Sequence, residues 1–100
     1  MSGRSLPDGL RDGIIAVVKH NCPTCTLVAP VLAELAAAGV PVTAYTQDDP
    51  AFPPLSPGLD VVDDTALDVS LALDLTTVPT VIKVEGGAEV DRLEGWSREQ

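Results

Sequence analysis

The residues of this 100-residue sequence that are best suited to chemistry are its two cysteines, Cys22 and Cys25, which stand three positions apart. In a helix this spacing places two side chains on one face, about one turn apart. Two thiols placed in this way can close a disulfide, or one can resolve a mixed disulfide that the other has formed. The pair therefore indicates thiol–disulfide exchange, with a Cys22–Cys25 disulfide as the oxidised form.

A predicted strand and a predicted helix position the two cysteines. The run from Ile14 to Lys19 is typical of a buried strand, and apolar residues recur at helical spacing between positions 27 and 38. Pro23 suits the first helical position, where no intrahelical N–H is needed. Cys22 then lies at the helix N-terminus, where free N–H groups and the helix dipole favour a thiolate. We expect Cys22 to be the exposed nucleophile and Cys25 the buried, less acidic partner.

Three segments, in the same order along the chain, resemble the thioredoxin superfamily. The first is the strand, Cys-Pro-Thr-Cys motif and helix of residues 17–30, with Pro30 five residues after the second cysteine. The second is Thr-Val-Pro-Thr at residues 77–80, which is similar to that family's cis-proline loop. The third is the glycine turn at 86–87 with the segment 89–95, which is similar to the family's closing hairpin.

The resemblance implies an α/β fold of three layers, a thioredoxin-like sandwich in which helices flank a central, mixed, four-stranded sheet. It implies that Pro79 is cis and that Val78 offers backbone groups to an extended substrate. His20 lies two residues before Cys22 and is expected to add positive charge near the thiolate. The expected site has two catalytic cysteines and five supporting residues: Cys22, Cys25, Pro23, Thr24, Val78, Pro79 and His20.

Two positions depart from the pattern of that family and leave alternatives open. Asn21 replaces an aromatic residue before the first cysteine, and Ala16 replaces a buried acid that helps to move the proton of the second. A thioredoxin-like interaction domain with little turnover is therefore one alternative. A metal-binding site with His20 as a third ligand is another, although a closed zinc site needs four ligands and the chain has one histidine and two cysteines.

The composition of the chain limits the classes of binding partner and the cellular compartment that we expect. The chain has 6 basic and 15 acidic residues and a net charge of −9, which argues against binding to nucleic acid or anionic membranes. Two cysteines are too few for a disulfide-rich scaffold. The sequence contains neither an apolar stretch of membrane-spanning length nor the apolar core of a signal peptide. We expect a cytoplasmic enzyme whose partners are protein disulfides and a reductant, with neither cofactor nor metal.

The chain divides into an N-terminal arm, residues 1–12, and one thioredoxin-like domain, residues 13–100. A proline-rich segment at 47–58 is interpreted as an insertion, because its prolines fit neither a helix nor a central strand. Phe52 is the large aromatic residue of this segment. It either packs onto the body of the domain, or the loop contacts a substrate or partner.

The remaining patterns predict two helices and three further strands. The helix that begins at Pro23 is expected to end near residue 38 with Gly39 as its cap, and strands are expected at 42–46, 80–84 and 89–94. A second helix is expected at 65–73, with Thr65 as its cap. Its inner face is expected to carry three leucines: Leu67, Leu71 and Leu75.

Two further predictions concern an acidic run and the C-terminus. The run of Asp60, Asp63, Asp64 and Asp68 is interpreted as a solvated face rather than a metal site. Ser97 and Gln100 have capping-box spacing, so a helix is expected to begin where the sequence stops. We therefore expect the C-terminal helix of the fold to be truncated, and we interpret Trp96 as a packing residue.

Overall fold

Strand β1 (Gly13–Val18) is the central strand of a five-stranded sheet with the order β3-β2-β1-β4-β5. The computed structural model describes residues 12–54, 56–75 and 77–95. β2 (Val42–Thr46) runs parallel to β1, and β3 (Leu59–Asp63) runs parallel to β2. An apolar run such as that of β1 is typical of a strand that is covered on both faces.

The other half of the sheet is an antiparallel hairpin. β4 (Thr80–Glu85) pairs antiparallel with β1, and β5 (Ala88–Glu94) pairs antiparallel with β4. The turn between them is held by Asp12, whose carboxylate accepts the N–H groups of Gly86 and Gly87 at 3.0 and 3.1 Å. The three strands predicted at 42–46, 80–84 and 89–94 are thus confirmed, with bounds that differ by one residue at most.

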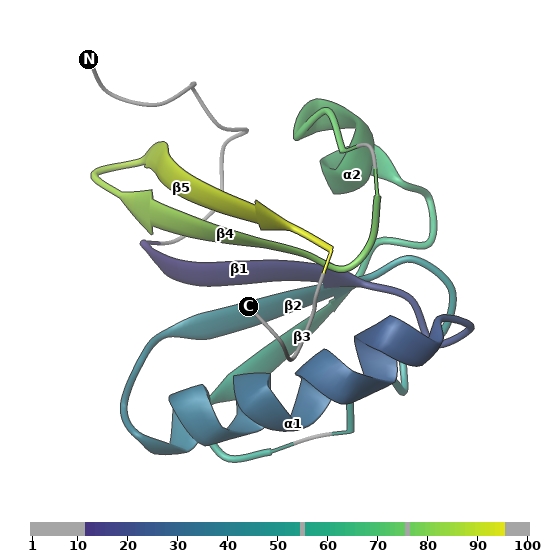
Figure 1. Cartoon of the computed structure of the whole chain (residues 1–100), viewed down its shortest axis with the longest axis horizontal. Helices are drawn as coiled ribbons and strands as arrows, with labels where there is room; N and C mark the ends of the chain where they lie inside the picture. Colours follow the sequence, from purple (N-terminus) through teal and green to yellow (C-terminus); the bar gives the residue numbers. More distant parts are fainter. Residues whose placement is uncertain (1–11, 55, 76, 96–100) are drawn as a thin grey trace.

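Two helices cover opposite faces of the sheet (Figure 1). Side chains alternate along β1, so Ala16 and Val18 belong to the apolar cluster under α1 (Pro23–Ala37). Ile15 and Val17 belong to the other cluster, under α2 (Asp68–Ala72). The predicted three-layer α/β class is therefore confirmed.

Helix α1 begins and ends where the sequence predicts. Cys22 is its N-cap and Pro23 its first residue. At its end Gly39 adopts a φ of +96°, and the N–H groups of Gly39 and Val40 donate to the carbonyls of Ala36 and Leu35. This pattern is a Schellman motif, which needs a residue that tolerates positive φ.

The prediction of four strands was wrong, because residues 59–63, in the acidic run, form a fifth strand, β3. β3 is an edge strand paired with β2 on one side, and it buries Leu59 while Asp60 and Asp63 face outward. Exposed charges are common on edge strands because they discourage pairing with other chains. The acidic run therefore lacks the apolar alternation by which a strand is usually recognised.

The prediction for the second helix was wrong in its length, its cap and its inner face. α2 covers five residues, and its first turn is capped by Asp64, which accepts the N–H groups of Val69 and Ser70 at 2.9 and 3.0 Å. Asp64 is buried at 4% exposure, so it does not share the solvated face expected for the acidic run.

The inner face of α2 also differs from the prediction, because Leu71 is 76% exposed and Leu73 is the buried leucine instead. A regular helix over 65–73 would turn Leu67 and Leu71 inward. The shorter helix, capped by Asp64, turns Leu73 inward instead. Of the three expected leucines, Leu67 is exposed and Leu75 packs against the inner cluster.

The described part of the proline-rich segment, residues 47–54 and 56–58, forms no helix and only one isolated bridge, between Ser56 and Leu59. Phe52 is buried and packs with the cluster under α1, so the first of its two interpretations, packing onto the body of the domain, is confirmed. Between this loop and the outer face of α1 lies a groove of about 310 Å³, whose walls include Pro30 and Pro54.

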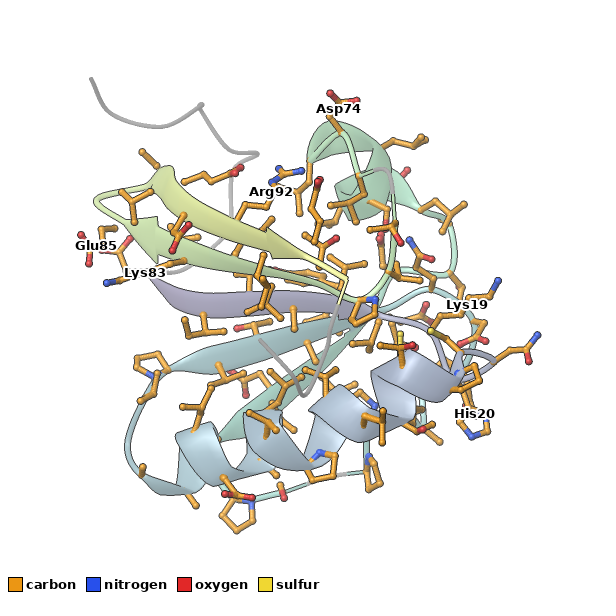
Figure 2. All side chains as sticks on the ribbon, viewed as in Figure 1. Lys19, His20, Asp74, Lys83, Glu85 and Arg92 are labelled. Carbon is orange, nitrogen blue, oxygen red and sulfur yellow. The ribbon has the colours of Figure 1, made fainter. Side chains whose placement is uncertain are left out.

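The two ends of the sheet carry different charged groups (Figure 2). Lys83 and Glu85 form an exposed ion pair of 3.2 Å at the hairpin end. Lys19 and His20 lie at the opposite end, where α1 begins. The cysteine pair is therefore at the end of the sheet to which the carboxyl ends of β1 and β2 point.

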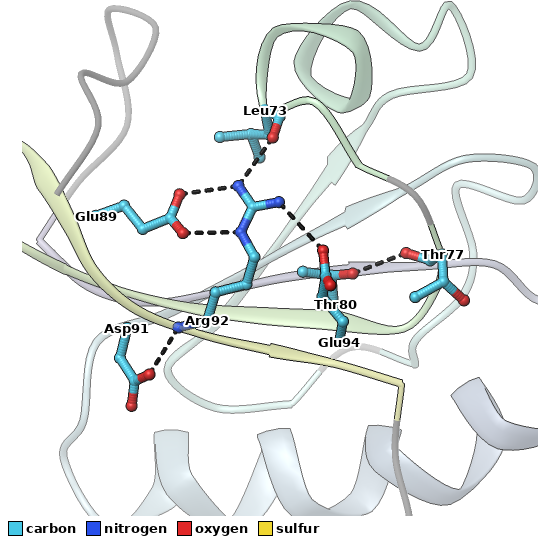
Figure 3. A network of polar contacts seen from close by, with 7 residues as sticks. All are labelled: Leu73, Thr77, Thr80, Glu89, Asp91, Arg92 and Glu94. Atoms are coloured by element: carbon cyan, nitrogen blue, oxygen red, sulfur yellow. Dashed lines mark hydrogen bonds and ion pairs between the residues drawn. The ribbon is translucent and has the colours of Figure 1, made fainter.

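A largely buried ion pair within β5 contacts the C-terminal end of α2 on the face away from α1 (Figure 3). The guanidinium of Arg92 donates two hydrogen bonds of 2.8 Å to the carboxylate of Glu89 and one to the carbonyl of Leu73. The side chains of Arg92 and Glu89 are only 12% and 11% exposed. The hydrogen bonds that Arg92 donates to Glu89, opposed by desolvation, raise the pKa of Arg92 above its ordinary value.

The expectations for most of the arm, for Trp96 and for a helix at 97–100 concern residues outside the described ranges. Among the helices that are described, none is long and apolar enough to cross a membrane.

Candidate active site at the start of helix α1

Cys22 is half-buried at the N-cap position of α1, with an extended backbone of φ −154° and ψ 111°. Its sulfur accepts the N–H of Cys25 at 3.4 Å, and its thiol points to the carbonyl oxygen of Val78 at 3.9 Å. Free N–H groups and the helix dipole favour negative charge at such a position. Cys22 is the cysteine that a reactant can approach, as the sequence predicts.

Cys25 is fully buried, one turn into α1, and its sulfur accepts the main-chain N–H of Lys19 at 3.3 Å. Burial, followed by the hydrogen bond to Cys22, raises the pKa of the Cys25 thiol to about 12. A thiol of this kind keeps its proton at neutral pH and can donate to the neighbouring sulfur. The two cysteines therefore differ in exposure, and burial raises the pKa of the inner one, Cys25.

The Val78–Pro79 bond is cis, which confirms the sequence prediction. Pro79 is fully buried, and its carbonyl accepts the N–H of Gly95 at 2.8 Å. The hydroxyl of Thr80 donates to the carbonyl of Thr77 at 2.7 Å across the same loop (Figure 3). These contacts present the carbonyl of Val78 to Cys22.

The other expected site residues lie close in sequence but differ in what they touch. Pro23 is exposed and Thr24 is half-buried, and both are in the first turn of α1 between the cysteines. The His20 side chain is 58% exposed and turns to the 47–58 loop. Its ring centroid is 5.1 Å from that of Phe52, and its Nδ1 is 3.5 Å from a carboxylate oxygen of Asp49. The structure thus places His20 against this loop.

The residue that sequence reasoning missed is Asp48. Its two carboxylate oxygens accept the main-chain N–H groups of His20 and Asn21 at 2.7 and 2.9 Å. Desolvation raises the pKa of Asp48, but hydrogen bonds from Asn21, His20 and Asp49 outweigh it, so the pKa is lower than usual. The position of Asp48 in the sequence, two residues after β2, could have indicated this role. The carboxyl ends of parallel neighbouring strands such as β1 and β2 lie at one edge of the sheet, so the residues that follow them lie close together.

Metal ligands are not gathered at this site. Within residues 12–54, 56–75 and 77–95, no group of three or more His, Cys, Asp or Glu side chains is placed to hold a metal ion. The groups that the described residues bring together are two thiols, the carbonyl of Val78 and the carboxylate of Asp48. Their chemistry is that of sulfur nucleophiles held among hydrogen-bond donors and acceptors.

The fold is similar to that of a solved thioredoxin. The crystal structure of the reduced thioredoxin pre-protein of Schistosoma mansoni matches with a TM-score of 0.55 and 18% sequence identity, over 86% of this chain and 70% of that chain. Neither a family model nor a curated protein matches the sequence. At this identity the likeness establishes the fold, which is thioredoxin-like, as the resemblance in the sequence implied.

Proposed function

We propose that the protein is a thiol–disulfide oxidoreductase that reduces or exchanges disulfides in other proteins through Cys22 and Cys25. The observation that carries the proposal is the asymmetry of the pair. Cys22 is half-buried at a helix N-terminus, whereas Cys25 is buried behind it with its pKa raised by burial. The thioredoxin-like fold and the carbonyl of Val78 beside the sulfur of Cys22 support the same function.

The first step forms a mixed disulfide. The thiolate of Cys22 attacks one sulfur of the substrate disulfide, a new bond joins Cys22 to the substrate, and the second substrate sulfur leaves as a thiolate that takes up a proton. The N–H of Cys25, 3.4 Å from the Cys22 sulfur, stabilises negative charge on the attacking atom. The carbonyl of Val78 lies beside this sulfur and is placed to pair with an extended substrate backbone.

The second step releases the substrate. Cys25 loses its proton and attacks the sulfur of Cys22, so that the Cys22–Cys25 disulfide forms and the remaining substrate sulfur leaves as a thiolate. Two electrons and two protons pass from the cysteine pair to the substrate in total. A dithiol or low-molecular-weight thiol then reduces the pair again. Pro23 and Thr24 keep the two sulfurs one helical turn apart throughout.

Reduction of insulin disulfides with dithiothreitol as the electron donor tests the proposal. We expect the protein to accelerate insulin precipitation above the rate with dithiothreitol alone, and Cys22→Ser to abolish the acceleration. Leu71→Ala, on the exposed face of α2, is the control for handling and folding. An insulin rate equal to that with dithiothreitol alone would instead favour a thioredoxin-like interaction domain.

The measured reduction potential of the pair decides between a reducing and an oxidising role, because proteins of these two kinds differ by more than about 100 mV. We also propose that the protein works in the cytoplasm. A chain with two cysteines has no disulfide framework to maintain, and the reducing conditions of that compartment keep such a pair in its dithiol form.

A further inference from the structure

A carboxylate from the segment after β2, that of Asp48, holds the loop that leads to the cysteine pair, whereas β1 itself offers only apolar side chains. We propose that Asp48 is a positioning residue of the thiol pair: it fixes the loop that presents the Lys19 N–H to the sulfur of Cys25, and its negative charge opposes a second one on Cys25. This inference rests on the proposed function, since it names a residue that influences the ionisation of Cys25, the resolving thiol.

The main-chain N–H groups of the loop before α1 carry the first part of the argument. Four consecutive N–H groups, from Lys19 to Cys22, have acceptors, and Asp48 takes the middle two with one oxygen each. The N–H of Lys19 then donates to the sulfur of Cys25 at 3.3 Å, and that of Cys22 donates to the carbonyl of His20 at 2.8 Å. The carboxylate therefore fixes the backbone on which both sulfurs depend.

Asp48 is itself held from both sides. The N–H of Gln47 donates to the carbonyl of Val18 at 3.0 Å, and the side-chain amide of Gln47 donates to the hydroxyl of Ser70 at 2.8 Å. The hydroxyl of Thr46 donates to the carbonyl of Asp49 at 2.9 Å. The main chain on either side of Asp48 is thus anchored to β1, to α2 and to the end of β2, which positions Asp48 for its two hydrogen bonds with the loop before α1.

The charges around Cys25 carry the second part. Burial and the hydrogen bond to Cys22 are the two largest causes that raise the pKa of Cys25. Negative charge on Cys22, at the start of the same helix, and on Asp48, after β2, also opposes a thiolate at Cys25. From the loop after β1, Lys19 acts through its main-chain N–H, and the side chain of His20 is engaged with Phe52 and Asp49. On β4 and the loop before it, Val78 and Pro79 carry no charge.

The charge of Asp48 bears on the resolving step. Burial is the largest cause that keeps the proton on Cys25, and negative charge on Cys22 and on Asp48 adds to it. When Cys22 is bound in a mixed disulfide, its sulfur carries no charge, whereas the carboxylate of Asp48 is still present. We therefore expect Asp48 to contribute to the cost of ionising Cys25 in the resolving step, in addition to burial.

The test is a titration of Cys25 in the Cys22→Ser background, where Cys25 is the one thiol and its thiolate is followed by ultraviolet absorbance. Removal of Cys22 takes away two of the causes that raise the pKa of Cys25 and brings its midpoint closer to the accessible range. Asp48→Asn removes the charge but keeps one acceptor oxygen for the loop N–H groups. We expect it in this background to lower the midpoint by about half a unit to one unit, since a negative charge that opposes the thiolate is removed. Asp48→Glu, which keeps the charge, restores most of the shift.

Asp49→Asn is the matched control, because it removes the same charge from the adjacent residue, whose carboxylate faces His20 rather than the loop N–H groups. We expect it to leave the Cys25 midpoint unchanged. Equal midpoints for Asp48→Asn and its parent, or equal shifts for Asp48→Asn and Asp49→Asn, would overturn the assignment. Thermal melts identify a variant that fails to fold, and Asp48→Ser then takes the place of Asp48→Asn.

The titration separates this inference from the proposed function, because it needs no turnover. If Asp48→Asn shifts the Cys25 midpoint but the protein fails to reduce insulin, the role of Asp48 is supported and the proposed enzymatic function is rejected. An unchanged midpoint in a protein whose insulin reduction requires Cys22 removes the role of Asp48 alone.

Discussion

We expect Cys22 to take nearly all of the label when the native, reduced protein is alkylated with iodoacetamide. The reason is that the thiolate is the reactive form, and burial holds the pKa of Cys25 at about 12. At about pH 8 the thiolate fraction of such a thiol is on the order of 10⁻⁴, whereas that of a free cysteine, with a pKa of about 8.5, is about a quarter. Protonation alone therefore slows the labelling of Cys25 more than about a thousandfold relative to a free thiol.

The assay is mass mapping of the labelled positions as a function of pH and time. The matched control is the same protein in denaturant, in which both cysteines label at similar rates because burial is lost. A second control is Cys22→Ser, which removes two causes that raise the pKa of Cys25 and so increases the labelling of Cys25 at alkaline pH. Labelling of Cys25 within about tenfold of Cys22 in the native protein at about pH 8 would refute the assigned roles.

Three other expectations concern stability, each followed by chemical denaturation. Arg92→Ala costs about 3 kcal/mol because it removes the guanidinium that donates two hydrogen bonds to the buried carboxylate of Glu89. Lys83→Ala, in an exposed ion pair, costs less than about 1 kcal/mol. Equal costs for the two variants would contradict this assignment. Asp64→Ala costs about 2 kcal/mol, because the first-turn N–H groups of α2 lose their acceptor, and a cost near zero would show that the cap is dispensable. The pKa of Cys25 is raised by burial from 9.0 to about 12, so its contribution to stability is complete below pH 9.0 and is lost as pH rises to about 12. Over that window the free energy of unfolding falls by about 1.4 kcal/mol per pH unit because of Cys25. Cys25→Ser removes this slope. Equal slopes in the unsubstituted protein and in Cys25→Ser would count against the raised pKa of Cys25.

The parts of the fold that the sequence predicts well are those with a strong local signal. The apolar run of β1, the N-terminal Pro23 and the C-terminal Gly39 each act through the residues beside them, and each is found where its pattern indicates. The cis bond at Val78–Pro79 is also confirmed. Both cysteines lie as expected, because their exposure follows from the position of α1 on the sheet.

The parts that the sequence does not reveal depend on contacts between distant segments. β3 is recognisable as a strand only through its pairing with β2, since its exposed side chains mix two aspartates with a valine, Val62, and do not alternate regularly with buried ones. Asp64 caps α2 across several residues of turn, and it is buried by the packing of that turn on the body of the domain. Asp48 reaches the cysteines because β1 and β2 are parallel neighbours, a fact of topology rather than of local pattern.

The central claim is that Cys22 attacks a substrate disulfide and Cys25 resolves the product, and trapping of the mixed disulfide tests it most directly. Cys25→Ser, incubated with a disulfide-containing protein such as insulin, is expected to accumulate a covalent complex that dithiothreitol releases. Mass mapping of this complex is expected to place the intermolecular bond at Cys22, and Cys22→Ser is expected to form far less of it. A Cys25→Ser protein that forms no such complex, or one joined through a residue other than Cys22, would contradict the account.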